Sequence, residues 1–132
     1  MRFVDTSFWV ALQFARDERH ANALELWRAR GATALLTTNH VLGETWTFLR
    51  RRAGHRAARA FVQAARISSV LAVEHVQPQV EQEAWDWLER HDERPYSFVD
   101  ATSFATMRRR RISEALAFDG DFAAAGFVEL RP

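Results

Sequence analysis

The chain has no cysteine among its 132 residues. This absence excludes a disulfide framework, a zinc site built from thiolates and a cysteine nucleophile, and it fits a reducing compartment. Lysine is absent too, so all 18 residues of the Lys and Arg class are arginines. The guanidinium group of arginine is the better bidentate partner for phosphate.

Long hydrophobic runs are missing as well. The apolar segment FWVALQFA at 8–15 is too short to cross a bilayer, and Asp5 falls where a signal peptide has only basic and apolar residues. We therefore expect a cytoplasmic protein. With 48% hydrophobic residues and no low-complexity linker, the chain is expected to fold as one domain over residues 1–132.

Strand and helix patterns alternate along the chain, which is typical of an α/β domain. Short apolar runs predict strands at 2–5, 34–38, 70–76, 115–118 and 127–130. Helical spacing predicts helices at 6–15, 18–30, 39–54 with Asn39 as the cap, 56–67, from 78 onward and around 98–107. We expect one parallel sheet with helices on its faces, which brings the carboxyl ends of the strands to one edge.

Acidic residues recur where such a fold would bury them or place them at that edge. Asp5 ends the first predicted strand, and Asp119 and Asp121 follow the strand at 115–118. Glu44 and Asp100 lie on helices, where their neighbours at helical spacing are apolar. A carboxylate on a buried face costs roughly several kcal/mol unless it is protonated, paired or bound to metal.

Each acid taken alone also has a simple structural interpretation. Asp5 is equally well placed to cap the helix that follows it. Asp119 and Asp121 flank a glycine, as in an ordinary surface turn. The acids on helices have possible salt-bridge partners, namely Arg51 for Glu44 and Arg108 for Asp100. No single acid decides between these interpretations and a shared site, and it is their joint recurrence that favours the site.

Several carboxylates that lie close together repel one another unless a cation lies among them. With oxygen ligands, no cysteine and no histidine pair at ligand spacing, the expected cation is Mg²⁺ or Mn²⁺ rather than zinc. Mg²⁺ is commonly completed by substrate phosphate, and a pair of such ions can activate water and stabilise the leaving oxygen. The pattern therefore indicates metal-dependent hydrolysis of a phosphodiester.

Four segments carry these acids in order: FVDTSFWVAL at 3–12, NHVLGETW at 39–46, SFVDATSFATM at 97–107 and ALAFDGDF at 115–122. Over essentially the whole chain this set resembles the acidic blocks of the PIN-domain ribonucleases, and the short length resembles the VapC-type toxins of bacterial toxin–antitoxin pairs. The resemblance implies a PIN-like three-layer α/β/α fold with a parallel five-stranded sheet. It also implies an endoribonuclease that depends on Mg²⁺ or Mn²⁺ and hydrolyses RNA phosphodiester bonds.

The resemblance also implies roles for particular residues. The expected metal-binding and catalytic quartet is Asp5, Glu44, Asp100 and Asp119, with Asp121 as an auxiliary acid. Thr6 and Ser103 are expected to support the carboxylates through hydroxyl hydrogen bonds. The expected partners are an inhibitory antitoxin protein, whose chain lies in a groove and extends a basic residue toward the acids, and a second copy of the chain in a homodimer.

RNA binding requires cations near these acids. Basic runs follow the helices that carry Glu44 and Asp100, and the candidates for phosphate contacts are Arg50, Arg51, Arg108 and Arg109. A solvated charge at a helix C-terminus is the alternative interpretation. Of the tryptophans, Trp9 alone is expected near the substrate.

Two other functions fit parts of the pattern. FVDTS places an aspartate at a strand end, as in phosphatases with an aspartyl nucleophile. Those enzymes usually need a second acid where Ser7 stands, and no lysine is present to neutralise the phosphoryl group. A non-catalytic RNA-binding module would keep the acids as caps and salt bridges, and it would show no carboxylate-dependent Mn²⁺ site.

Overall fold

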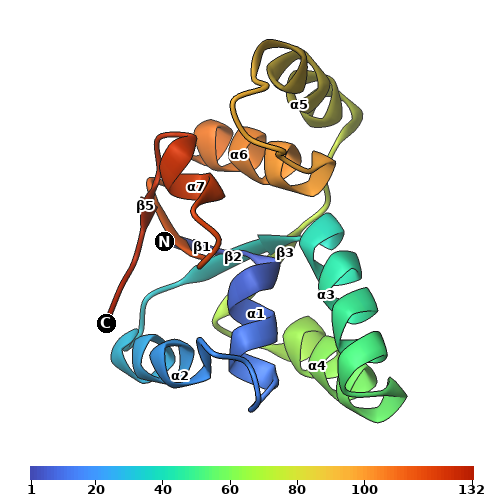
Figure 1. Ribbon diagram of the computed structural model, residues 1–132, viewed down its shortest axis with the longest axis vertical. Coiled ribbons are helices and arrows are strands. Elements are labelled where there is room, and N and C mark those ends of the chain that lie inside the picture. The colour runs from blue at the N-terminus through green and yellow to red at the C-terminus, as the bar shows by residue number, and fades with distance from the viewer.

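The computed structural model describes residues 1–132, whose strands form a parallel five-stranded sheet in the order β3-β2-β1-β4-β5 (Figure 1). The strands are β1 Arg2–Val4, β2 Leu35–Thr38, β3 Leu71–Glu74, β4 Glu114–Leu116 and β5 Val128–Glu129. The helices are α1 Thr6–Gln13, α2 His20–Ala29, α3 Asn39–Arg52, α4 His55–Ile67, α5 Pro78–Arg90, α6 Phe98–Arg110 and α7 Asp121–Ala124. None of these helices is both long and apolar enough to cross a membrane.

The helices cover both faces of the sheet. In Figure 1, α1, α2 and α4 lie below the sheet, and α5, α6 and α7 lie above it. Helix α3 packs against α1 and α4 and also reaches α6, so it links the two helical layers. The expected three-layer α/β/α fold with a parallel sheet is confirmed.

Strand β1 lies at the centre of the sheet, and the chain builds outward from it in both directions. It first adds β2 and β3 on one side, and then returns to add β4 and β5 on the other. The two strands at the reversal pair through Phe3 with Ala115 and Val4 with Leu116. Such a reversal leaves a crevice outside the carboxyl ends of the strands, where open α/β sheets bind their ligands. Asp5 follows β1 at this crevice, and Asp119 follows β4 at the same edge.

A buried aromatic cluster holds the upper helices together. Phe104 on α6 has no exposed surface. Its ring centroid lies 4.9–5.8 Å from those of four other aromatic residues, Trp87, Tyr96, Phe122 and Phe127. Aromatic pairs of this kind stabilise by about 0.5–1.5 kcal/mol each beyond the burial of their area. The cluster therefore helps to position α6 and α7, which carry two of the acids.

Trp9 belongs to the core of the lower layer. Its side chain packs against Trp27 and Phe61 at centroid distances of 5.9 and 5.3 Å, and the residue is 3% exposed. The expectation that Trp9 lies near the substrate is wrong. Position 9 is one turn beyond Asp5 on α1, and this turn directs the indole toward α2 and α4, away from the carboxyl edge of the sheet.

Several element boundaries differ from the prediction. At two of them, side chains take over backbone hydrogen bonds. Helix α3 is capped by Thr38, whose hydroxyl accepts from the N–H of Val41, whereas Asn39 accepts from the N–H of Val76. Strand β4 ends at Leu116 rather than at residue 118. Beyond it, the N–H of Phe118 donates to the Ser7 hydroxyl, so the chain turns away before Asp119.

Candidate active site

Asp5 follows β1 and caps α1. Its Oδ2 accepts from the backbone N–H of Ser7 at 3.0 Å and from the Ser7 hydroxyl at 2.7 Å. Asp5 is 2% exposed, and its Oδ1 is buried without a hydrogen-bond partner. The capping interpretation is confirmed, yet half of the carboxylate is unsatisfied. A buried ionised carboxylate requires a counter-charge, so this oxygen calls for either a proton or a cation.

Asp100 occupies the first turn of α6 as part of a capping box. The Ser97 hydroxyl accepts from the N–H of Asp100 at 2.9 Å, and Asp100 Oδ2 accepts from the N–H of Ser97 at 2.9 Å. The residue is 8% exposed, and its Oδ1 makes no hydrogen bond. Asp100 therefore resembles Asp5, because one oxygen stabilises a helix start and the other remains available.

Asp119 and Asp121 lie on a tight turn between β4 and α7. Asp119 Oδ1 accepts from the N–H of Asp121 at 3.1 Å, and Gly120 between them has a φ of 84°, which glycine adopts without strain. The side chain of Glu129 is 3% exposed and accepts from the N–H groups of Gly120 at 3.2 Å and Ala123 at 3.0 Å. The interpretation of this segment as a turn is confirmed, and Glu129 holds the turn in place.

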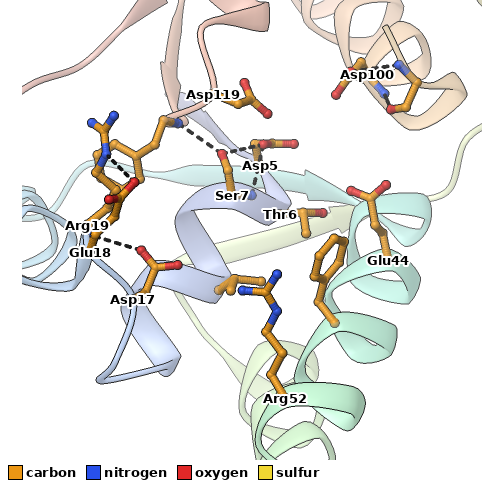
Figure 2. Close-up of a pocket in the computed structure, with 14 residues that line it drawn as sticks. Asp5, Thr6, Ser7, Asp17, Glu18, Arg19, Glu44, Arg52, Asp100 and Asp119 are labelled. Atoms are coloured by element: carbon orange, nitrogen blue, oxygen red, sulfur yellow. Dashed lines mark hydrogen bonds and ion pairs between the residues drawn. The ribbon is translucent and has the colours of Figure 1, made fainter. Parts of the chain in front are cut away.

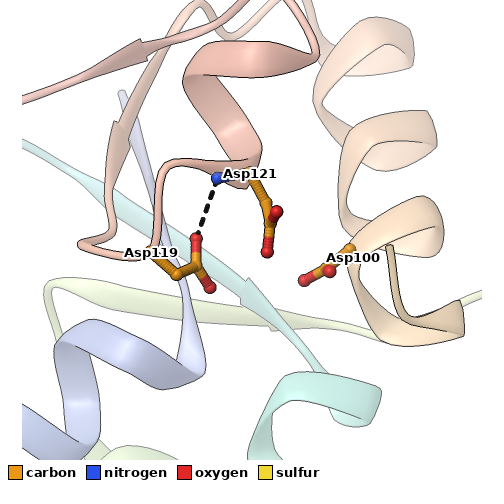
Figure 3. Close-up of side chains that lie close together, drawn as sticks. All are labelled: Asp100, Asp119 and Asp121. Atoms are coloured by element: carbon orange, nitrogen blue, oxygen red, sulfur yellow. Dashed lines mark hydrogen bonds between the residues drawn. The ribbon is translucent and has the colours of Figure 1, made fainter. Parts of the chain in front are cut away.

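These local structures bring the acids to one place. Available oxygens of Asp100, Asp119 and Asp121 lie within 4.8 Å of one another (Figure 3). Asp5, Glu44, Asp100 and Asp119 line one cleft of about 400 Å³, into which Glu44 extends from α3 (Figure 2). The cleft thus collects the predicted quartet, with Asp121 beside it. Asp5 and Glu44 lie outside the tightest group of three.

Neither salt bridge that the sequence allowed is present. Glu44 forms no ion pair, and neither does Asp100. Arg108 lies in the last turn of α6, far along the helix from Asp100, and its guanidinium lies 5.9 Å from the centroid of the Trp87 ring. The acids of the cleft are therefore not neutralised by the arginines nearest to them in helical spacing.

The clustering of buried carboxylates changes their titration. The pKa of Asp5 is raised from 3.8 to about 8, mainly by burial and next by the charge of Asp119, while the hydrogen bonds from Ser7 oppose the shift. Burial likewise raises the pKa of Asp100 to about 6. Incomplete hydration and the charges of Asp121 and Glu129 raise the pKa of Asp119. These shifts mean that the cleft accumulates more negative charge than the fold alone can stabilise at neutral pH.

The donor set fits a hard divalent cation. Several carboxylates line the cleft, and their oxygens are the ligand type that Mg²⁺ and Mn²⁺ prefer. The buried Oδ1 of Asp5 has no other partner, and three further carboxylates have oxygens within 4.8 Å of one another. The residues of the cleft that could hold such an ion are Asp5, Glu44, Asp100 and Asp119. Asp121 does not line the cleft, but one of its oxygens belongs to the tight group with Asp100 and Asp119.

The hydroxyl that supports a carboxylate is that of Ser7. It donates to Asp5 and accepts from the N–H of Phe118, so it ties the start of α1 to the segment before Asp119. Thr6 instead donates to the carbonyl of Val41 at 3.4 Å, and the buried hydroxyl of Ser103 has no partner. The expected hydrogen bonds from Thr6 and Ser103 to the carboxylates are absent, and the Thr6 hydroxyl is directed at α3 instead.

Two charged residues at the acidic turn were not foreseen. Arg94, in the loop before α6, donates from Nε to Asp121 Oδ1 at 2.8 Å, and Glu129 binds the backbone of the turn as described above. Arg94 lies in the polar segment HDERPYS, and Glu129 lies in a predicted strand. No spacing rule connects either residue to the acids, because both contacts depend on the tertiary fold.

The predicted RNA-binding arginines lie in different surroundings. Arg50 and Arg51 are exposed and form no ion pair, while Arg109 is engaged by Glu83 at 2.6 Å. The arginines that line the cleft itself are Arg19 and Arg52. Arg52 was part of a predicted basic run, but Arg19 was not singled out.

The model of the PIN domain family matches residues 2–128. The chain belongs to the PIN-domain family. It is 62% identical over 132 residues to a protein named 23S rRNA-specific endonuclease VapC20 in two strains of Mycobacterium tuberculosis, CDC 1551 / Oshkosh and H37Rv, with 100% of this chain and 99% of the relative covered. The crystal structure of Mycobacterium tuberculosis VapC20, described as a sarcin-ricin loop cleaving toxin, matches with a TM-score of 0.95 and 61% identity over 100% of both chains.

These similarities confirm the family resemblance and the PIN-like fold inferred from the sequence. They also confirm an endoribonuclease of the toxin class. Nothing in them supports a phosphatase or a non-catalytic RNA-binding module. For a PIN-domain nuclease, the acidic cleft at the carboxyl edge of the sheet is the natural candidate for the active site.

The metal-free protein should lose stability as the pH rises through the titration of Asp5. Its folded pKa of about 8 lies above the ordinary value of 3.8, so the stability that this proton contributes is fully present below about pH 4 and is lost as the pH rises toward 8. Asp5→Asn should remove most of this dependence and raise the free energy of unfolding at pH 8 by about 2 kcal/mol or more. Urea unfolding in EDTA at pH 5 and pH 8 measures both effects.

Asp86→Asn on the exposed face of α5 is the matched control, and it should follow the wild-type pH profile. If the free energy of unfolding falls equally between pH 5 and pH 8 in the wild type and in Asp5→Asn, the titration of Asp5 is not the cause of the fall.

Proposed function

We propose that this endoribonuclease depends on Mg²⁺ or Mn²⁺ and cleaves the sarcin-ricin loop of 23S ribosomal RNA. The metal dependence is inferred from the buried Oδ1 of Asp5, which accepts no hydrogen bond from the protein. Asp5 lines the same cleft as the other carboxylates, so this oxygen requires a cation or a proton. The substrate proposal rests on the 62% identity to VapC20 over 132 residues. Sequence-specific recognition of RNA commonly targets loops with accessible bases, which fits an open cleft at a sheet edge.

The residues of the cleft have separable roles in this proposal. Asp5, Glu44, Asp100 and Asp119 hold the cation, and Ser7 keeps Asp5 oriented by donating to its Oδ2. When bound, the ion lowers the pKa of a water molecule and neutralises charge on the phosphate that is attacked. The capping interactions of Asp5 and Asp100 hold the carboxylates in place before substrate arrives, so little reorganisation is needed at the moment of reaction.

Arginines beside the acids are proposed to hold the RNA backbone. Arg19 and Arg52 line the cleft, so they are the residues we expect to contact the phosphates next to the scissile bond. Arg50 and Arg51 are exposed on the last turn of α3 and could extend this contact. Arg108 and Arg109 remain candidates at a greater distance from the acids, because both lie in the last turn of α6 and Asp100 lies in the first.

An antitoxin protein is the proposed partner of the lower layer. A groove of about 560 Å³ between α1, α2 and α4 is lined mainly by apolar side chains, among them Leu12, Leu24, Trp27 and Phe61. Helix α1 borders this groove and, through Ser7 and Val10, also borders the acidic cleft. A chain that lies in the groove is therefore well placed to extend a basic residue toward the acids.

A homodimer is also proposed, as the family resemblance implies. Trp85 on α5 is 51% exposed, and its ring stacks on that of Phe98 with 4.2 Å between the ring centroids. This exposed aromatic pair supports an interface on the upper layer, which lies on the opposite face of the sheet from the antitoxin groove.

Asp100→Asn should abolish cleavage while leaving the fold intact. The amide can keep the capping box through its oxygen but cannot supply the negative charge that a metal site requires. We expect the rate of cleavage of a synthetic sarcin-ricin loop RNA to fall by at least about 100-fold in the presence of Mg²⁺. Chelation of the metal by EDTA should have the same effect on the wild type.

Asp86→Asn, with the same charge change outside the cleft, should cleave at the wild-type rate. Full activity of Asp100→Asn would refute the proposed site. Equal cleavage of the loop RNA and a scrambled RNA of the same length would refute the proposed substrate but not the nuclease activity.

Ala64→Trp should weaken inhibition by the cognate antitoxin. Ala64 is exposed on α4 and lines the apolar groove, so a bulky side chain would fill the groove without removing a core contact. We expect at least a tenfold higher antitoxin concentration for half-inhibition, with uninhibited cleavage unchanged. Gln63→Trp, the exposed neighbour outside the groove, is the control. Equal inhibition of both variants would place the antitoxin elsewhere.

A further inference from the structure

A guanidinium group lies against the turn that carries Asp119 and Asp121. Arg94 donates from Nε to Asp121 Oδ1 at 2.8 Å and from Nη2 to the backbone carbonyl of Asp119 at 3.2 Å. The side chain of Asp121 is 18% exposed and that of Arg94 is 39% exposed. Arg94 thus contacts both ends of the turn, and the hydrogen bond to Asp121 raises the pKa of the guanidinium.

The surroundings of Arg94 are matched to this contact. A Cβ atom at Gly120 would lie 3.3 Å from Arg94 Nη2, so the glycine lets the guanidinium approach the turn closely. Glu93, the acid next to Arg94 in the sequence, is engaged by His91 at 3.1 Å and by Tyr96 at 3.5 Å. Asp121 is therefore the carboxylate with which Arg94 pairs.

This pairing changes what the acidic group can bind. One carboxylate oxygen from each of Asp100, Asp119 and Asp121 lies within 4.8 Å of the others. Figure 3 shows the three side chains pointing toward one another. Such a charge density attracts cations. Arg94 already supplies a fixed positive charge on the Asp121 side. A divalent ion that used Asp121 would have to displace the guanidinium or withstand its repulsion. Asp5 and Glu44, which line the cleft, form no ion pair with an arginine.

We propose that Arg94 is a positioning residue that pairs with Asp121 and thereby restricts the acidic centre to one tightly bound divalent ion. The inference rests on the proposed function, because it assumes that the acids of the cleft bind metal. It assigns Asp121 to the guanidinium and leaves Asp5, Glu44, Asp100 and Asp119 to the ion. In this arrangement the fold itself supplies a cation where a second metal ion would otherwise be favoured.

Titration of the metal-free protein with Mn²⁺, followed by calorimetry and by electron paramagnetic resonance, tests the proposal. The wild type should bind one Mn²⁺ tightly per chain. In Arg94→Gln the affinity for a second Mn²⁺ should rise at least tenfold, and the spectrum should show spin coupling between two neighbouring ions. Arg94→Lys should restore single-ion binding, because it retains the positive charge.

Two further variants separate this effect from a general change in charge. Arg90→Gln, at an exposed residue of α5 without an ion pair, should bind Mn²⁺ as the wild type does. Asp121→Asn in the Arg94→Gln background should remove the second ion again, since the acid that Arg94 released is then lost. A second-ion affinity in Arg94→Gln that equals that of the wild type would overturn the proposal.

The failure of this proposal is distinguishable from failure of the proposed function. If Asp5→Asn and Asp100→Asn bind Mn²⁺ as tightly as the wild type, the acids are not the metal site and both proposals fail. If those two variants lose the tight ion while Arg94→Gln behaves as the wild type, the metal site stands and the role of Arg94 is refuted.

Discussion

The site depends on the different environments of the two carboxylate oxygens in each of three aspartates. In Asp5, Asp100 and Asp119, one oxygen accepts hydrogen bonds from the local backbone, at a helix cap, a capping box and a tight turn respectively. The second oxygen of each is free of protein partners. The local hydrogen bonds fix the direction of each carboxylate, so the free oxygens can converge without support from long, flexible side chains.

The fold determines where that convergence occurs. Asp5 and Asp119 follow β1 and β4, the neighbouring strands between which the order of the sheet reverses, and Asp100 approaches from a helix above the sheet. Burial makes the arrangement unfavourable in the absence of a cation, as the raised pKa values of Asp5 and Asp100 show. The same burial strengthens the attraction for a divalent ion, because electrostatic interactions are less screened away from water.

Much of this site could be predicted from the sequence, because its acids lie next to regular elements. Asp5 and Asp100 stand at helix starts within similar segments, FVDTS and FVDATS, and strand ends of a parallel sheet meet at one edge. From the sequence, capping and metal binding are alternative roles for Asp5, yet the structure shows that one carboxylate caps a helix and still presents a free oxygen. The local sequence pattern thus identifies the acids, but it does not show that the two oxygens of one carboxylate have different partners.

The rest could not be predicted because it depends on contacts between distant segments. Ser7 rather than Thr6 supports Asp5, since the N-terminal turn of α1 directs the second hydroxyl, not the first, toward the cap. Arg94 and Glu129 meet the acidic turn only through tertiary packing. Trp9 was assigned by proximity in sequence to Asp5, although one helical turn suffices to direct it into the core.

The central claim is that a divalent cation replaces a proton on the buried carboxylates. Calorimetric titration with Mn²⁺ at pH 7, in two buffers of different ionisation enthalpy, counts the protons released on binding. Because the pKa of Asp5 is about 8 in the metal-free protein, we expect the release of about one proton per ion. Asp5→Asn should lose the tightly bound ion and this proton release together. Binding without proton release by the wild type would contradict the account.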